Sequence, residues 1–312
     1  MRVHRRHHKA ESGRSRREGT NPQVDSRAYA FAYAIRTLAD FPADVQVPQA
    51  ERGFIVALFL PQETPGRFSS SAYPAHILVL FPDLVVVAAH PSVQRLEHWI
   101  PIDHIVWMES KRYLLDGALT LQTREHRYTY QFNARDSHAV DEFLAPLRAR
   151  IMPQARQKKV AAPTAYGASL DLKFTHAERT WLEPNEKLRL RFFSPPVQHS
   201  RGRLLFRKVE WSAGDYVAFT NHRILWLTDR NGPLRDAYGI TLLESPLSRM
   251  SKLSVTSEGD SGRLEIVFDP GLAWHIPVRA EWLEQAKGFV RDGQSVGARV
   301  NGGYQFGPRI LG

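Results

Sequence analysis

The stretch Gly214–Asp229, GDYVAFTNHRILWLTD, decides the fold. Two short apolar runs, Tyr216–Phe219 and Ile224–Thr228, flank the four polar residues Thr220–Arg223. Short apolar runs around a polar segment are typical of a β-hairpin, and Asn221 tolerates the left-handed conformation that a tight turn requires. The sequence therefore predicts an antiparallel hairpin in the second half of the chain.

More strand patterns follow this hairpin, and a helical pattern follows them. Extended patterns cover Leu247–Val255, Arg263–Phe268 and Trp274–Val278. Apolar residues of Ala280–Val290 recur on one helical face, and Trp282 is among them. The second half is therefore predicted to be an antiparallel β unit that ends in one amphipathic helix.

The first half shows the same order of patterns, displaced by roughly 140 residues. Its predicted elements are the strands Gly53–Leu60, Ile77–Phe81, Leu84–Ala89, Trp99–Met108, Ala118–Thr123 and Arg127–Phe132 and the helix His138–Ile151. Ser137 is the expected cap of that helix, and Pro146 predicts a kink or an early end. Two β units in one order indicate duplication of a domain, because solenoid repeats are much shorter.

The segment Thr-Asn-x-Arg between apolar strands, at Thr220–Arg223, resembles the turn motif of bacterial pleckstrin-homology-like (PH-like) domains. Such domains end in a single helix that often carries an inward Trp, and Trp282 stands in that place. The resemblance covers about residues 40–290 and is looser in the first copy, where Pro82 and Asp83 replace the motif. It implies a mainly β fold with C-terminal capping helices, arranged as two tandem PH-like antiparallel barrels or sandwiches.

Composition divides the chain into five segments. They are a disordered basic tail at 1–25, PH-like domain 1 at 26–152, a linker at 153–168, PH-like domain 2 at 169–291 and a flexible tail at 292–312. Asp25–Asp40 is predicted to be helical, although its alternating aromatic residues also fit a strand. Thr175 is expected to cap a short helix that ends at Trp181, and Ser194–Gly202 is predicted to be a loop. The tryptophans expected in the core are Trp99, Trp107, Trp211, Trp226, Trp274 and Trp282.

The composition also limits the classes of function. Because the chain has no cysteine, it forms neither disulfides nor thiolate metal sites, and a reducing cytoplasm is the expected compartment. No apolar run reaches the about 20 residues that a transmembrane helix needs. No G-x-S-x-G, H-E-x-x-H or P-loop pattern occurs. We therefore predict a non-enzymatic protein with no catalytic residues, no metal and no cofactor.

Basic residues of the second copy are the candidate anion- or lipid-binding site. The set is Lys187, Arg189, Arg191, Arg201, Arg203, Arg207 and Lys208. The first three alternate with leucines and are expected to share one face of a strand. The resemblance implies that basic residues on this hairpin hold phosphates, as in lipid-binding PH domains, and the arginine fork suits phosphate oxygens. A solvated strand face is the alternative interpretation.

Two functions of different classes remain open at this point. The main prediction is an interaction or scaffold module whose tandem PH-like domains bind a protein partner. The alternative is peripheral binding to an anionic phospholipid membrane, at the inner face of the cell membrane, through the basic hairpin of domain 2. Nucleic acid is expected to bind only through the N-terminal tail, where residues 1–20 hold seven Lys and Arg against two Glu.

Overall fold

The computed structural model describes residues 31–42, 52–62, 74–90, 96–113, 116–152, 162–201, 208–212, 214–229, 239–258, 261–269 and 271–301. The elements of the first β unit are β1 (Tyr33–Ile35), β2 (Val56–Leu60), β3 (Ala75–Leu80), β4 (Leu84–His90), β5 (Leu96–Pro101), β6 (Ile105–Arg112), β7 (Asp116–Thr123), β8 (Arg127–Asn133) and α1 (Ser137–Ile151). Those of the second β unit are β9 (Thr164–Gly167), α2 (Leu172–Trp181), β10 (Leu188–Ser194), β11 (Val197–Arg201), β12 (Lys208–Ser212), β13 (Asp215–Thr220), β14 (Arg223–Thr228), β15 (Ile240–Pro246), β16 (Met250–Glu258), β17 (Ser261–Phe268), β18 (Leu272–Arg279) and α3 (Leu283–Asn301).

The same order of elements occurs in both β units. In each, a strand ends at a proline and a single 3-10 turn follows, η3 (Ile102–His104) after β5 and η5 (Leu247–Arg249) after β15. The N–H of Ile102 donates to the carbonyl of Asp83 at 2.9 Å, and the N–H of Leu247 donates to the carbonyl of His222 at 3.0 Å. Three strands, a second 3-10 turn and the closing helix then follow in each unit. Matching backbone hydrogen bonds therefore accompany the matching order.

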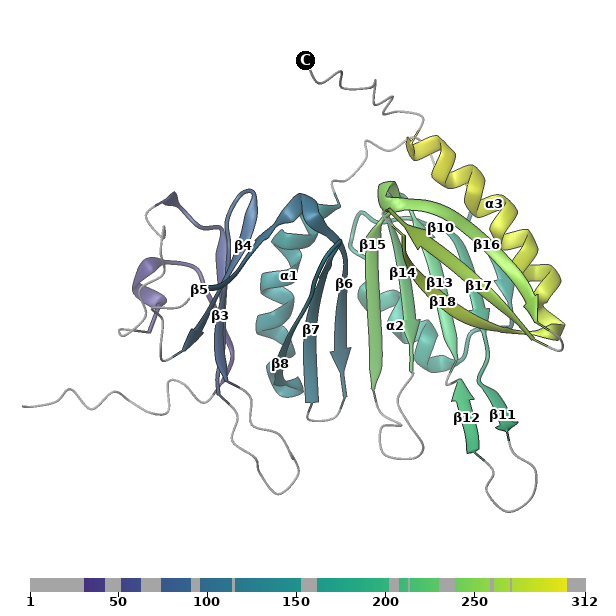
Figure 1. The fold of residues 1–312 in the computed structure, drawn as a ribbon, viewed down its shortest axis with the longest axis horizontal. Helices are drawn as coiled ribbons and strands as arrows, with labels where there is room; N and C mark the ends of the chain where they lie inside the picture. Colours follow the sequence, from purple (N-terminus) through teal and green to yellow (C-terminus); the bar gives the residue numbers. More distant parts are fainter. Residues whose placement is uncertain are drawn as a thin grey trace, which may run out of the picture. The chain divides into compact units, whose positions relative to one another are not determined.

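A continuous sheet joins the two β units (Figure 1). Its strand order is β8-β7-β6-β15-β14-β13-β10-β9, so β6 of the first unit pairs with β15 of the second. This pairing is antiparallel and places Glu244 opposite Met108. The other described sheets are β1-β2-β3-β4-β5, β16-β17-β18 and the hairpin β11-β12. The prediction of a mainly β chain with a C-terminal helix is confirmed, and none of the described sheets closes into a barrel.

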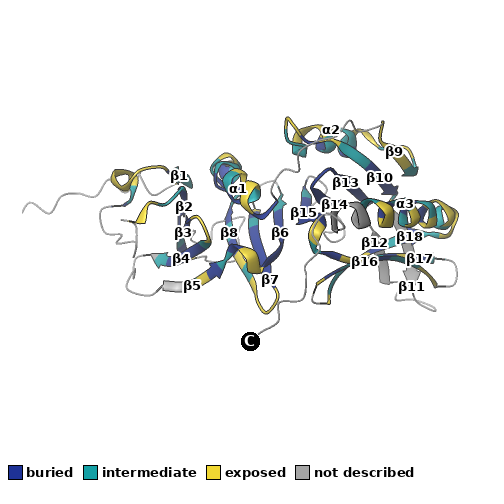
Figure 2. Ribbon diagram, turned by 90° about the horizontal axis from the view of Figure 1, so that it is seen from above, coloured by how far each residue is buried: buried dark blue, intermediate teal, exposed yellow. Residues whose placement is uncertain are grey.

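Each β unit has its own apolar core beneath its helix. In the first unit, inward side chains of β2–β5 meet those of β6–β8 and of α1. In the second unit, β10 and β13–β15 meet β16–β18 and α3 in the same way. A third cluster lies on the outer face of the second unit, where α2 covers β13, β14 and β15. Figure 2 shows the central strands as mostly buried and the outward faces of the helices as exposed.

The predicted helix Asp25–Asp40 is wrong where the structure describes it. Residues 33–35 form β1, which pairs with β2 and places Tyr33 opposite Phe59. A single 3-10 turn, η1 (Leu38–Asp40), follows. The alternating aromatic residues follow the strand period, because the edge of β2 offers backbone hydrogen bonds and a neighbouring aromatic ring. The part of the prediction before Phe31 lies outside the described residues.

Two helix ends differ from their predictions. Helix α2 begins at Leu172 because the carboxylate of Asp171, not Thr175, accepts the N–H of Phe174 at 2.9 Å. Helix α1 has Asp136 at its N-cap position, and the Ser137 hydroxyl donates to the carbonyl of Ala134 instead of capping. It also continues through Pro146 to Ile151. Burial of its apolar face on both sides of the proline offsets the lost backbone hydrogen bond.

Segments predicted to be irregular contain regular elements. Half of the predicted linker 153–168 forms β9, which pairs in parallel with β10. Helix α3 continues to Asn301, nine residues into the predicted tail that begins at 292. The two are connected because Tyr166 packs against Phe289 and its hydroxyl donates to Asp292. The predicted loop after Ser194 includes β11, and the predicted strand Trp99–Met108 is interrupted by η3. Residues 1–25, 153–161 and 302–312 lie outside the described part.

The tryptophans divide into buried and exposed groups. Trp107, Trp226 and Trp274 are buried, as predicted. Trp282 is only half-buried, and the inward aromatic side chain of α3 is Phe289 instead. Trp99 is 41% exposed on β5, so its prediction as a core residue is wrong. The side chain of Trp211 lies outside the described residues.

Candidate functional site

The arginine of the Thr-Asn-x-Arg motif is buried at the centre of an ion-pair network. Arg223 begins β14 and is fully buried. Its Nε donates to Glu186 at 2.7 Å, its Nη1 donates to Glu244, and its Nη2 donates to the carbonyl of Trp181 at 2.7 Å. Both carboxylates are also buried. The motif arginine therefore joins the end of α2, the start of β10 and β15.

The same network continues into the first β unit. Arg148 of α1 donates two hydrogen bonds to Glu244, at 2.8 and 2.9 Å. A second carboxylate, that of Glu183, lies 3.7 Å from its Nη1. Glu244 therefore lies between one arginine from each unit, where β15 meets β6. A buried carboxylate is stable only with such partners, because desolvation costs several kcal/mol per ion.

The arginines keep the two buried glutamates ionised. Burial alone would raise the pKa of Glu244, but the attraction of Arg148 and Arg223 outweighs it and holds this pKa below its usual range. Burial likewise opposes the ionised form of Glu186, and the hydrogen bonds and charge of Arg223 lower the pKa of Glu186 overall. In return, the carboxylates raise the pKa of Arg223. The network is therefore charged at neutral pH.

His222 is the group in this region that should respond to mild acid. Its ring is buried in the β13–β14 turn, its Nδ1 has no hydrogen-bond partner, and Glu186 lies 3.6 Å from its Nε2. Burial lowers the pKa of His222 below the ordinary 6.5, although Glu186 acts in the opposite direction. The unfolded chain therefore binds a proton more readily than the folded chain below about pH 6.5.

We expect the protein to lose stability as the pH falls from about 7.5 to about 5.5, because His222 is neutral in the folded state and protonated in the unfolded state. His222→Gln should flatten this part of the profile, as measured by urea unfolding at each pH. His138→Gln is the matched control, because His138 is an exposed helix residue. An identical pH dependence in wild type and His222→Gln would contradict the assignment.

The structure does not bring the predicted basic residues onto one strand face. A β-bulge lies between Leu188 and Leu190, so Leu188 packs outward under α2 and Leu190 packs into the core. The expected shared face of Lys187, Arg189 and Arg191 is therefore wrong, because the bulge reverses the alternation.

Each member of the basic set has a different environment. Lys187 is exposed, and its backbone N–H donates to Asn221 at 3.0 Å. Arg189 is half-buried and its Nε has no partner, whereas Arg191 lies 3.3 Å from the carboxylate of Glu178 on α2. Arg201 and Lys208 lie opposite each other in the β11–β12 hairpin. The side chains of these two, and Arg203 and Arg207 altogether, lie outside the described residues.

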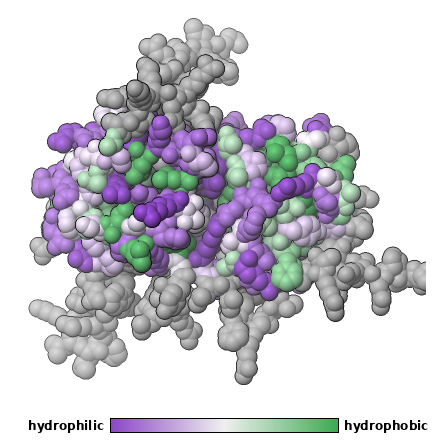
Figure 3. Space-filling model, turned by 180° about the vertical axis from the view of Figure 1, so that it is seen from behind, coloured by the Kyte–Doolittle hydropathy of each residue, from purple (hydrophilic) through white to green (hydrophobic). Residues whose placement is uncertain are grey.

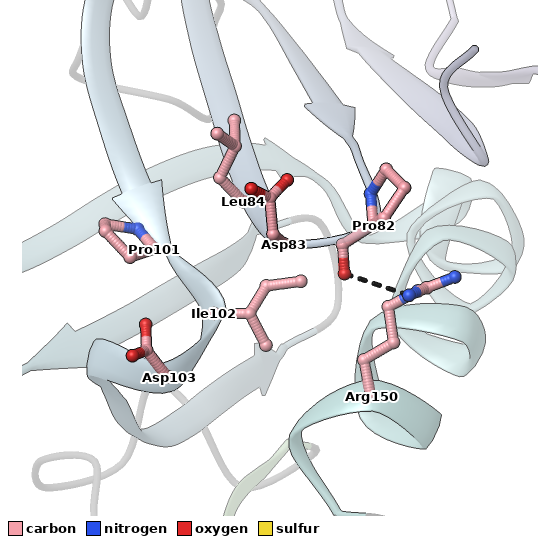
Figure 4. A pocket seen from close by; sticks show the side chains of 7 residues that line it. All are labelled: Pro82, Asp83, Leu84, Pro101, Ile102, Asp103 and Arg150. Atoms are coloured by element: carbon pink, nitrogen blue, oxygen red, sulfur yellow. Dashed lines mark hydrogen bonds between the residues drawn. The ribbon is translucent and has the colours of Figure 1, made fainter. Parts of the chain in front are cut away.

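A hollow of about 640 Å³ lies at one corner of the first β unit (Figure 4). The β3–β4 turn, the β5–η3 turn and the end of α1 line it, through Pro82, Asp83, Leu84, Pro101, Ile102, Asp103 and Arg150. Arg150 closes one side, where its Nη1 donates to the carbonyl of Pro82 at 2.9 Å. The corner combines proline, isoleucine and leucine carbons with two carboxylates and one guanidinium, and its volume is that of an ordinary ligand site.

The matching corner of the second β unit is filled by the chain itself. The hydrogen bonds from Ile102 to Asp83 and from Leu247 to His222 identify the two corners as equivalent. In the second unit, the segment Trp181–Lys187 crosses this corner, where its carboxylate binds Arg223 and its last N–H binds Asn221. The same corner of the fold thus holds a short polypeptide segment in one unit and a hollow in the other.

Other observations limit the chemistry of the described residues. Among them, no three His, Asp or Glu side chains gather closely enough to hold a metal ion. Within the same residues, no helix combines the length and the hydropathy needed to cross a membrane. Figure 3 shows a face on which hydrophilic side chains separate small apolar patches. No protein-family model matches the chain, and comparison with curated proteins finds no match either.

Sequence reasoning missed both the network and the hollow. Arg148, Glu186, Arg223 and Glu244 are far apart in the sequence and share no motif spacing. One signal was available, since Glu244 interrupts the apolar pattern of β15 and a charge inside a buried strand requires a partner. The hollow had a weaker signal in Pro82 and Asp83, which differ from the Asn221 and His222 turn.

Proposed function

We propose that the chain is a non-enzymatic, tandem PH-like interaction module that binds a segment of a partner protein in the hollow of the first β unit. The comparison of the two corners carries this proposal. In the second unit, one backbone N–H and one carboxylate of Trp181–Lys187 bind the corner. The empty counterpart offers a short peptide similar contact with the β3–β4 turn.

The lining of the hollow indicates the chemistry of such a segment. Asp83 and Asp103 are exposed, and their carboxylates suit a Lys or Arg side chain. Ile102 lies between Asp103 and Arg150 in Figure 4 and offers an apolar surface beside them. We therefore expect a peptide that combines a basic side chain with proline or an aliphatic residue.

Membrane binding through the basic hairpin is less well supported. Arg191 is already paired with Glu178, and the bulge separates it from Lys187. Phosphate recognition by several cations requires them to converge on one position. The described members of the set do not share a face.

The test is binding of the full chain to an array of short synthetic peptides that combine Lys or Arg with proline or leucine. Asp103→Lys should weaken binding of the positive peptides about tenfold or more, because hydrogen bonds to charged groups contribute roughly 1.5–3 kcal/mol. Asp116→Lys is the matched control, since it makes the same charge change at an exposed position of β7 outside the hollow.

Two results would overturn the proposal. One is binding that Asp103→Lys leaves unchanged or that Asp116→Lys weakens equally. The other is an array without any positive peptide, together with sedimentation on phosphatidylserine vesicles that Lys187→Glu abolishes, since that result would favour the membrane function. Peptide binding that depends on Asp103 supports the proposal.

A further inference from the structure

The junction between the two β units pairs strands that are not equivalent. β6 follows η3 in the first unit, and its counterpart in the second unit is β16, which follows η5. β15 ends at Pro246 before η5, and its counterpart is β5, which ends at Pro101 before η3. The β6–β15 pairing is therefore head to tail. Head-to-tail contacts between repeated units leave one complementary surface open at each end.

The two counterpart strands lie at the ends of their sheets. Among the described strands, β5 is the last of β1-β2-β3-β4-β5, and β16 is the first of β16-β17-β18. The register of the junction, with Glu244 opposite Met108, transfers directly to these strands. It places Trp99 of β5 opposite Leu253 of β16. With six and nine residues, the strands are long enough to form such a ladder.

Backbone directions at the free edge of β16 match those at the junction. The hydroxyl of Ser245 donates to the carbonyl of Val106 at 2.8 Å, so this carbonyl of β6 faces β15. Alternation then directs the Met108 carbonyl the same way, and Leu253 is its counterpart. The side-chain amide of Gln294 donates to the Leu253 carbonyl at 3.0 Å, as expected of a carbonyl that faces outward. One side-chain hydrogen bond thus stands where the junction has a strand.

The side chains at the free ends differ from those at the junction in a correlated way. At the junction, Arg148 from the closing helix binds Glu244. At the free ends, Trp99 stands in the place of Glu244, and Gln294 stands at the corresponding position of the other closing helix. Both members of the ion pair are thus replaced by uncharged residues, so pairing of the free ends would bury no unpaired charge at this position.

Trp99 also has an environment that suits an interface. It is 41% exposed although it lies on a strand edge, and exposed tryptophan is typical of interface anchors. Its indole would lie against Leu253 and the side chain of Gln294 of the next molecule. We infer that the protein assembles head to tail, with β5 of one copy pairing with β16 of the next. This goes beyond the proposed function, because it requires no peptide in the hollow.

Two edge variants of the full chain test the assembly. Trp99→Asp places a charge in the new ladder and blocks the β5 end. Val255→Pro removes an N–H that faces outward, two residues after Leu253, and blocks the β16 end without removing a hydrogen bond to β17. Leu172→Asp is the control, since Leu172 is 86% exposed on α2 and lies on neither edge. Circular dichroism verifies folding, and Val255→Lys replaces Val255→Pro if the proline variant does not fold.

Sedimentation equilibrium over a range of concentrations gives the decisive readout. Wild type and Leu172→Asp should form species larger than dimers, whereas each edge variant alone should remain monomeric. An equal mixture of the two edge variants should form a dimer and nothing larger, because each supplies the edge that the other has lost. Monomeric wild type at every concentration, a symmetric dimer as the end point, or a mixture that stays monomeric would overturn the inference.

Discussion

Arg223→Ala is expected to lower the free energy of unfolding by about 3–5 kcal/mol, because removal of one partner of a buried ion pair leaves the other charge uncompensated. The variant deprives Glu186 of its bound guanidinium and leaves Glu244 with Arg148 alone. It also removes the donor to the Trp181 carbonyl, at the end of α2. Urea unfolding followed by circular dichroism measures the loss.

Arg291→Ala is the matched control for this prediction. Arg291 is 79% exposed and lies 3.4 Å from Asp292 on α3, and exposed pairs contribute about 0–1 kcal/mol. A loss at Arg223 no greater than that at Arg291 would show that the network contributes little. Arg148→Ala should fall between the two, since Arg223 would still compensate Glu244.

Trp107→Ala is expected to destabilise the chain by about 3–5 kcal/mol, through the core of the unit to which Trp107 does not belong. Trp107 is part of β6, yet its ring lies 5.6 Å from that of Phe268 and 5.8 Å from that of Trp274, both in the second unit. Truncation should therefore loosen β16–β18 as well as the junction. Unfolding by urea, with hydrogen exchange of β17 amides, measures both effects.

Trp99→Ala makes the same chemical change on an exposed part of β5. At low protein concentration it should alter stability by no more than about 0.5 kcal/mol, as surface substitutions usually do. If Trp107→Ala behaves like Trp99→Ala, or if the β17 amides keep their protection, the second core does not depend on the first unit.

The predicted strands were the most reliable part of the sequence interpretation. The hairpin around Asn221 and the strands β3, β4, β7, β8, β17 and β18 follow from runs of apolar or alternating residues between turn signals. These signals are local, because a strand with one buried face must alternate and a tight turn needs particular residues. Local patterns were therefore sufficient for the elements.

Features that depend on distant residues were not predictable from the sequence. The bulge before Leu190 changes the face of every preceding residue, and nothing in the letters KLRLRFF indicates it. The closing position predicted for Trp282 is taken by Phe289, because the 3-10 turn before α3 shifts the helix by two turns relative to the expected match. The hollow depends on the meeting of two turns and a helix end, none of which carries a recognisable motif.

The pairing of β6 with β15 also has a consequence for synthesis of the chain. Arg112 leaves the ribosome well before its partner Ile240, and elongation at about 5–20 residues per second separates them by roughly ten seconds. During that interval β6 presents a bare backbone edge, and the indole of Trp107 lacks its aromatic neighbours. We expect the nascent first half to engage chaperones until the second half has emerged.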